Sequence, residues 1–448
     1  MKNSMMRMST LTAAILAASP VMAGGFDKSD HSFGILFGDD NVITTSFSQT
    51  AVNTKGTASQ IYGGDQSIGT GTIVSDIINP EVALRLSAAD NVTCALKVEE
   101  PYGAEVAYAD DSLVYDIDPG DGSSVAITAP VATKYESQSL TVGCGYDFAL
   151  SAGKLTVLAG PKIQSIKGFF SEDLSSLDAG SADNLEVDLD GGTEVGYILG
   201  AAYSIPEIAL RASIIYHSQI DYTGTGTIDS VVPLSQLGMG ADVGFTTTGS
   251  AKTFTPQSVE IALQSGVAEN TLAFLNVRWS EYSKLNELSI EGDGSVAIPS
   301  AGDASFDDIN AQASAVTGID NVLGDLIDPS LSLFHQDTLD VAFGMGRQLT
   351  DNLAIGASYS ASLKLGSKYS LTPDGADSDN VRVPASETQT FSFGGEYSVT
   401  PEFTLNGGLA YTLLDSYTAE DPDTNGGLVV RFGQAEATSF QLGMSYAL

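Results

Sequence analysis

Long apolar runs are missing from the chain beyond its first 23 residues. Those residues have a basic start at Lys2 and Arg7, a short apolar core at 11–18 and a small-residue cleavage site at 21–23. This is the layout of a secretory signal peptide. After it, no stretch reaches the roughly 18–20 apolar residues that a membrane-spanning helix needs. The sequence therefore predicts an exported protein that begins at Gly24 and has no spanning helix.

Basic residues are scarce, with 19 Lys and Arg against 56 Asp and Glu and a formal charge of −37. This balance excludes nucleic acid as a partner, because phosphate binding needs clustered Lys and Arg. The acidic residues concentrate in connecting segments, at 110–122, 172–190, 291–294 and 419–427. Solvation of these segments is the favoured interpretation, and divalent-cation bridging at a lipopolysaccharide surface is the alternative.

Cysteine and histidine are rare, with two Cys and three His in the chain. Cys94 and Cys144 lie on neighbouring predicted strands, so a disulfide in an oxidising compartment is possible, but the sequence leaves the pairing open. His31, His217 and His335 are far apart in sequence, and the chain has no G-x-S-x-G, Walker or H-E-x-x-H motif. We therefore expect no catalytic residues, no bound metal and no cofactor.

Glycine and aromatic residues are abundant instead, with 47 Gly, 18 Phe and 17 Tyr. Runs of alternating apolar and polar residues, which predict half-buried strands, flank six short polar turns. These turns are at residues 89–91, 151–153, 205–207, 266–270, 350–352 and 400–402. Much longer polar connections separate the six hairpins.

Short turns that alternate with long loops are typical of a transmembrane barrel, with the turns in the periplasm and the loops outside. The six hairpins supply 12 strands, and one strand at about 42–53 and another at about 437–448 bring the count to 14. The predicted fold is therefore all-β, a 14-stranded antiparallel transmembrane β-barrel over residues 42–448. Its expected location is the outer membrane of a Gram-negative bacterium.

The predicted third strand, residues 92–108, carries its own interruption. Pro101 has no N–H for a neighbouring strand, and Gly103 weakens a strand interior, yet alternation resumes in "AEVAY". A kink in the wall is the favoured interpretation. The alternative is that this segment simply ends the strand at a loop.

One long loop contains an apolar group within "SVVPLSQLGMG". An exposed apolar patch on an extracellular loop usually indicates binding, so this loop is a candidate first docking site. A short helix packed on the barrel rim explains the pattern equally well. The apolar residues are Val231, Val232, Leu234, Leu237 and Met239.

Four segments together resemble the FadL/TodX family of outer-membrane transporters for long-chain fatty acids and other hydrophobic molecules. They are "GGFDKSDHSFGILF", "EEPYGAEVAY", "TPQSVEIALQSGVAENTLAFLNVRWSEYSKL" and the final hairpins that end in "FQLGMSYAL". The last strand also resembles the C-terminal signal that barrel-assembly machinery recognises. The resemblance implies a 14-stranded barrel with an N-terminal hatch, here 24–41, and passive uptake of a hydrophobic ligand.

The resemblance also assigns roles to particular residues. Gly24, Gly25 and Phe26 would enter an internal ligand pocket. The kinked third strand would open the wall for sideways exit to the lipid, and its residues here are Pro101, Tyr102, Gly103 and Ala104.

A fatty acid carboxylate would need a cation, for which the candidates are Lys97, Lys162, Lys167 and Arg278. Most such charges in barrels pair with a nearby carboxylate instead. Trp279 and Tyr282 are expected among the aromatic residues at the bilayer edge. Besides its hydrophobic ligand, the expected partners are outer-membrane lipid, lipopolysaccharide and the assembly machinery, and the barrel is expected to be a monomer. The alternatives are a general porin or ion channel and a structural or adhesive surface barrel.

Overall fold

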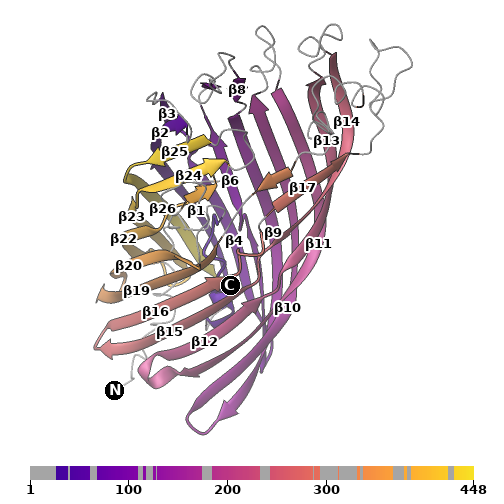
Figure 1. The fold of residues 1–448 in the computed structure, drawn as a ribbon. Helices are drawn as coiled ribbons and strands as arrows, with labels where there is room; N and C mark the ends of the chain where they lie inside the picture. The colour runs from indigo at the N-terminus through magenta and orange to yellow at the C-terminus, as the bar shows by residue number, and fades with distance from the viewer. Residues whose placement is uncertain are drawn as a thin grey trace.

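The computed structural model describes residues 27–38, 41–60, 68–108, 115–117, 125–127, 129–173, 184–232, 243–285, 287–292, 311, 330–332, 336–366, 378–380, 385–421 and 428–448. Within these ranges the chain forms a closed barrel of 14 antiparallel strands (Figure 1), which confirms the predicted fold class. The barrel closes because β1 (Val42–Asn53) pairs with both β4 (Ile77–Ala89) and β26 (Ala435–Ala447).

Several of the 14 wall strands are each made of two elements that are consecutive in sequence and continue in the same direction. The remaining elements of the wall are β5 (Val92–Glu99), β6 (Gly103–Ala107), β9 (Ala129–Leu150), β10 (Gly153–Asp173), β11 (Asn184–Ile205), β12 (Leu210–His217), β13 (Ile220–Val232), β14 (Val243–Thr255), β15 (Ser258–Ala268), β16 (Thr271–Ser280), β17 (Glu287–Gly292), β18 (Ser330–Ser332), β19 (Asp337–Thr350), β20 (Leu353–Leu365), β22 (Thr388–Ser398) and β23 (Phe403–Leu414).

The wall is apolar outside and polar inside. In β5, Val98 faces outward and is 45 % exposed, whereas Lys97 and Glu99 on either side of it are buried in the lumen. The same alternation places large apolar side chains on the outer surface of most wall strands. This pattern matches a lipid-facing surface around a polar interior. The polar groups that face inward include Arg85, Lys162, Gln164, Glu260, Arg278, Thr390, Thr412 and Gln441.

The short turns lie where the sequence predicts them, and in Figure 1 those of the β9–β10 and β11–β12 hairpins lie at the lower end of the barrel. The β11–β12 turn contains the 3₁₀ helix η3 (Pro206–Ile208). No helix in the described part of the chain is long and apolar enough to cross a membrane.

Above the wall, a second sheet covers one side of the barrel (Figure 1). It is built on a small core that includes Val106, Val430 and Phe432, with the ring of Tyr417 stacked 4.6 Å from that of Phe432. Its strands are β21 (Ser378–Asn380), β24 (Tyr417–Asp421), β25 (Leu428–Phe432), β2 (Lys55–Gln60) and β3 (Ile68–Thr72); a separate pair is formed by β7 (Tyr115–Ile117) and β8 (Val125–Ile127).

The third strand of the wall is interrupted between β5 and β6. Glu99 lies opposite Ser139 of β9, and Gly103 lies opposite Glu136. Three residues of the third strand, 100–102, therefore face only two residues of β9, 137 and 138. This excess of one residue is a β-bulge, and bulges bend a strand and disrupt its ladder.

A disulfide joins strands three and four below the bulge. Cys94 and Cys144 lie directly opposite each other, with their Cα atoms 4.0 Å apart. The structure therefore contains the Cys94–Cys144 disulfide, which the sequence alone does not decide.

Removing this disulfide should destabilise the barrel. The two cysteines are 50 residues apart in sequence, and closing a loop of that length lowers the entropy of the unfolded chain by an amount worth about 4 kcal/mol. We expect the double variant Cys94→Ser/Cys144→Ser to unfold at lower urea concentration than the oxidised protein, as measured by gel mobility. Wild-type protein kept reduced should behave like the variant. Equal unfolding midpoints for all three would contradict the prediction.

Candidate functional site

Residues 27–38, here called the luminal segment, lie inside the barrel. The segment contains the short 3₁₀ helix η1 (Gly34–Phe37). Phe33 and Leu36 are 1 % and 2 % exposed. They pack against inward-facing residues from four strands, Ala95, Leu158, Ile198 and Ile215. β10, β11 and β12 are neighbours in the wall and β5 is separated from β10 by β9, so these contacts hold the segment against this side of the lumen.

A buried ion pair attaches the start of the luminal segment to the opposite wall. Asp27 Oδ1 accepts hydrogen bonds from Arg278 at 3.1 Å and from His31 Nε2 at 2.7 Å. Burial alone would raise the pKa of Asp27, but the Arg278 guanidinium, followed by His31, holds it well below its usual range. The carboxylate is therefore ionised at neutral pH and compensates the charge of Arg278.

A second cluster of charges lies beside β5. The ammonium of Lys97 is 3.0 Å from Glu99, 3.1 Å from Glu81 and 3.5 Å from Asp30 of the luminal segment. Lys97 also donates a hydrogen bond to the Ser32 carbonyl at 2.9 Å. The two clusters tie the luminal segment to both sides of the lumen.

The bulge makes direct contact with the luminal segment. The Lys28 N–H donates to the Pro101 carbonyl at 2.9 Å, so the segment pairs with the third strand from inside. On the other side, the Tyr102 N–H donates to Ser137 Oγ at 2.9 Å, and the Ser137 N–H donates to the Tyr102 carbonyl at 3.1 Å. Pro101 and Tyr102 are buried as a result.

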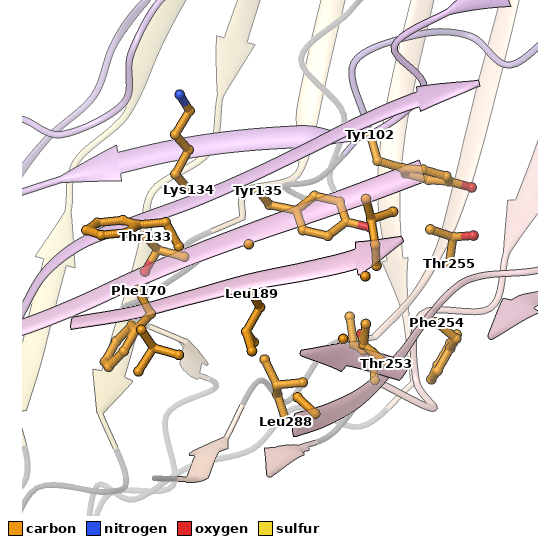
Figure 2. Close-up of a pocket in the computed structure, with 18 of the residues that line it drawn as sticks. Tyr102, Thr133, Lys134, Tyr135, Phe170, Leu189, Thr253, Phe254, Thr255 and Leu288 are labelled. Atoms are coloured by element: carbon orange, nitrogen blue, oxygen red, sulfur yellow. The ribbon is translucent and has the colours of Figure 1, made fainter. Parts of the chain in front are cut away.

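A largely apolar cavity, here called the apolar cavity, lies beside the bulge in the upper half of the barrel. It holds about 950 Å³ of space, counting its open mouth. Figure 2 shows Phe170, Leu189, Leu288 and Phe254 around it, with the rings of Tyr102 and Tyr135 at one side. Lys134 also belongs to its lining, but Figure 2 shows the ammonium of this residue pointing away from the other side chains. The cavity therefore offers an apolar ligand a surface that is mostly aliphatic and aromatic.

A second cavity, here called the wall cavity, passes beside the bulge. From the lumen it is lined by Asp27, Tyr135 and Val106, and its outward-facing residues include Glu105 and Glu136. Side chains on both faces of the wall thus line one space. Here the residues just before β4 meet the third strand through the Val74–Val106 bridge and through hydrogen bonds from the Ser75 N–H to Glu105 and from the Ala107 N–H to Ile73.

The four candidate cations have different environments. Lys97 and Arg278 are buried and neutralised by carboxylates, and Lys167 is exposed and 3.7 Å from Asp190. Lys162 is 4 % exposed and forms neither an ion pair nor a hydrogen bond with the described residues; its ammonium lies 5.7 Å from the centre of the Tyr102 ring.

Several predicted residues lie outside the part of the chain that the structure describes. These are Gly24, Gly25 and Phe26 of the expected hatch and Leu234, Leu237 and Met239 of the expected docking loop. Val231 and Val232 form the end of β13. The docking site and the pocket role of residues 24–26 therefore stay predictions.

Tyr282 corrects one expectation. The sequence places it at the bilayer edge with Trp279, but it is 1 % exposed and packs on Tyr102 and Leu285 inside the barrel. Tyr282 lies three residues after Trp279, and along β16 Arg278 and Ser280 point inward on either side of Trp279, so the alternation itself places residue 282 on the inner face. The contacts made by Asp27, Lys28 and Tyr135 also have no local sequence signal, because each depends on residues distant in sequence.

Solved structures similar to this chain share its barrel. A Pseudomonas aeruginosa FadL homologue has a TM-score of 0.68 and 15% identity, covering 97% of this chain and 99% of that one. The P. putida toluene transporter TodX has a TM-score of 0.55 and 14% identity, covering 92% of each chain. The Ralstonia pickettii toluene transporter TbuX has a TM-score of 0.55 and 10% identity, covering 96% and 98%.

These identities are low, so the likeness shows a shared fold. No curated protein matches the sequence significantly. The profile of the family described as outer membrane protein transport protein (OMPP1/FadL/TodX) matches residues 13–448. Since this match covers nearly the whole chain, the protein belongs to the FadL/TodX family of outer-membrane transport proteins.

Proposed function

We propose that this outer-membrane transporter carries long-chain fatty acids, or amphiphiles of similar shape, from the apolar cavity sideways through the wall at the bulge. One observation supports this route above the others. The wall cavity is lined by residues of both faces of the wall, and it shares Lys134 and Tyr135 with the apolar cavity. A ligand in the apolar cavity is thus one side-chain layer away from the lipid.

Sideways exit suits an apolar cargo physically. The direct path down the lumen is obstructed by the luminal segment and lined by charges such as Lys97 and Arg278. A ligand that leaves through the wall reaches hydrocarbon without crossing water, and each CH₂ kept dry is worth about 0.8 kcal/mol. The luminal segment would then act as the hatch, which closes the lumen to water and ions.

A polar end on the cargo is supported by buried polar groups on the inner face of β10 and β12, on β10 just before the residues that line the apolar cavity. Lys162 has no counter-ion among the described residues, and neither amide atom of Gln164 nor either ring nitrogen of His217 has a hydrogen-bond partner there. Buried polar groups are normally satisfied. A carboxylate that moves past the Tyr102 ring would meet all three types of donor, which favours fatty acids over plain hydrocarbons.

Aromatic hydrocarbons are the second candidate cargo, because two similar structures are described as toluene transporters. The general porin is disfavoured, since the luminal segment fills the lumen that a porin leaves open. An adhesive barrel would have no use for a cavity through its wall. We also propose that the protein acts as a monomer, because a single barrel holds both cavities and the segment.

Filling the apolar cavity should reduce uptake. Gly224 lines it, and a Cβ added there would lie no closer than 3.7 Å to any other atom. A leucine at this position would displace one or two ligand methylenes, so initial uptake of radiolabelled hexadecanoate should fall by about tenfold in Gly224→Leu. Cells without their own transporter would be compared with and without the variant.

The neighbouring Thr223→Leu is the matched control, because Thr223 faces outward. Toluene uptake, measured in parallel, separates the two candidate cargoes. If wild-type protein moved toluene and no hexadecanoate, the cargo assignment would be wrong. If it moved neither, the transport proposal itself would fail.

A further inference from the structure

Lys28 spans the wall opening with its backbone. Its N–H donates to the Pro101 carbonyl on the third strand at 2.9 Å. Its own carbonyl accepts from Asn79 Nδ2, on the second strand, at 2.9 Å. The luminal segment therefore bridges the two strands at the level where they stop pairing with each other, and it does so whatever the side chain of residue 28 is.

The side chain of Lys28 occupies the space that Gly103 leaves. A Cβ added to Gly103 would lie 2.5 Å from Cδ of Lys28, so the lysine stem passes directly over the glycine Cα. Both residues line the wall cavity. The missing side chain at residue 103 is thus replaced by a side chain from inside the barrel.

The ammonium of Lys28 ends at a carboxylate beside the bulge. Its Nζ is 2.6 Å from Oε2 of Glu100, with side-chain exposures of 17 % and 31 %. This ion pair is partly solvated, in contrast to the buried Asp27–Arg278 pair. It holds the stem in place but can exchange, because exposed ion pairs contribute little free energy.

We propose that Lys28 is the gating and selectivity residue of the wall opening. At rest its stem fills the opening and Glu100 holds its ammonium. The carboxylate of a departing fatty acid takes the place of Glu100, so the stem swings aside with the head group. A neutral hydrocarbon offers no such exchange and must displace the stem without compensation. The proposal rests on sideways exit through the wall.

The test compares initial uptake of radiolabelled hexadecanoate and hexadecane, which have the same number of carbons. Lys28→Met keeps the stem and removes the charge, so the hexadecanoate-to-hexadecane uptake ratio should fall by about fivefold, near the upper limit for a partly exposed ion pair. Lys28→Arg should keep the ratio. Glu100→Gln frees the ammonium, so the carboxylate of the cargo no longer competes with Glu100, and hexadecanoate uptake should rise. Lys154→Met, which removes a cation paired with Asp147 near the β9–β10 turn, is the control.

An unchanged ratio in Lys28→Met, with both cargoes still transported, would overturn the proposal while leaving sideways exit intact. Unchanged hexadecanoate uptake in Glu100→Gln would overturn it as well, and this arm does not depend on how Lys28→Met folds. If sideways exit itself is wrong, the result is different. Deletion of Pro101, which removes the bulge, would then leave the uptake of both cargoes unaltered.

Discussion

Deletion of Pro101 is expected to reduce hexadecanoate uptake to the background of cells without the protein. The deletion removes the extra residue of the bulge, because Glu100 and Tyr102 would then face Gln138 and Ser137 one to one. After the deletion, the side chains of Glu99 and Tyr102 would still point into the lumen, as they do in the structure. A continuous third strand could extend its pairing, and the passage beside it would close.

Two comparisons separate this effect from misfolding. Pro101→Val restores an N–H but keeps the extra residue, so it should transport at an intermediate rate. Pro161→Val changes a proline in β10 where the pairing with β9 keeps its register, and it should transport like wild type. All variants must remain heat-modifiable on gels. Undiminished uptake by an intact Pro101-deleted barrel would remove the wall opening from the mechanism.

Asp27→Asn is expected to release the luminal segment and make the barrel leak ions. The variant leaves the Arg278 charge buried without its carboxylate, and breaking a buried pair in this way costs about 3–5 kcal/mol. We expect frequent open events in planar bilayers and faster hydrogen exchange over residues 27–38. The double variant Asp27→Asn/Arg278→Gln, which removes both charges, should regain part of the closure. Asp147→Asn, which breaks a more exposed pair with Lys154, should stay closed.

Acid should act in the same direction as Asp27→Asn. Burial, followed by the charge of Arg278, lowers the pKa of His31 to about 4, although its contact with Asp27 opposes this. In the released segment the pKa would return to about 6.5. Docking is therefore strongest above pH 6.5 and weakens as the pH falls towards 4. Conductance that does not depend on pH across this range would exclude His31 from the anchoring of the segment.

The wall could be predicted from the sequence because its rules are local. Period-two alternation and short polar turns repeat along the chain, and each turn is decided by three to five neighbouring residues. Pro101 and Gly103 also indicated an interruption of the third strand. The sequence around them could not reveal the one extra residue, because a bulge is defined by comparing the number of residues on two paired strands. Here that number depends on which residues of β9, Ser139 and Glu136, lie opposite the third strand.

The interior could not be predicted in the same way. Asp27 and Arg278 are 251 residues apart, and Ser32 and Glu260 are 228 residues apart. An alternating strand shows which side chains point inward, but the contact partner of each depends on the height and rotation of every strand around the barrel. For this reason four basic residues were equal candidates in the sequence, and only the structure distinguishes Lys162, which has no ion-pair partner among the described residues.

The height of the bulge determines how a molecule would enter the membrane. Immediately below it, Val98 presents an apolar side chain to the lipid, and at its own level the outer face carries the ion pair of Lys134 and Glu136. From this change in the outer face we infer that the bulge lies where hydrocarbon gives way to the head-group layer. On the proposed route, a fatty acid that emerged there would be upright, with its carboxylate among the head groups and its tail in the outer leaflet. The proposed route would therefore load one leaflet only, and movement to the inner leaflet would be left to the lipid bilayer.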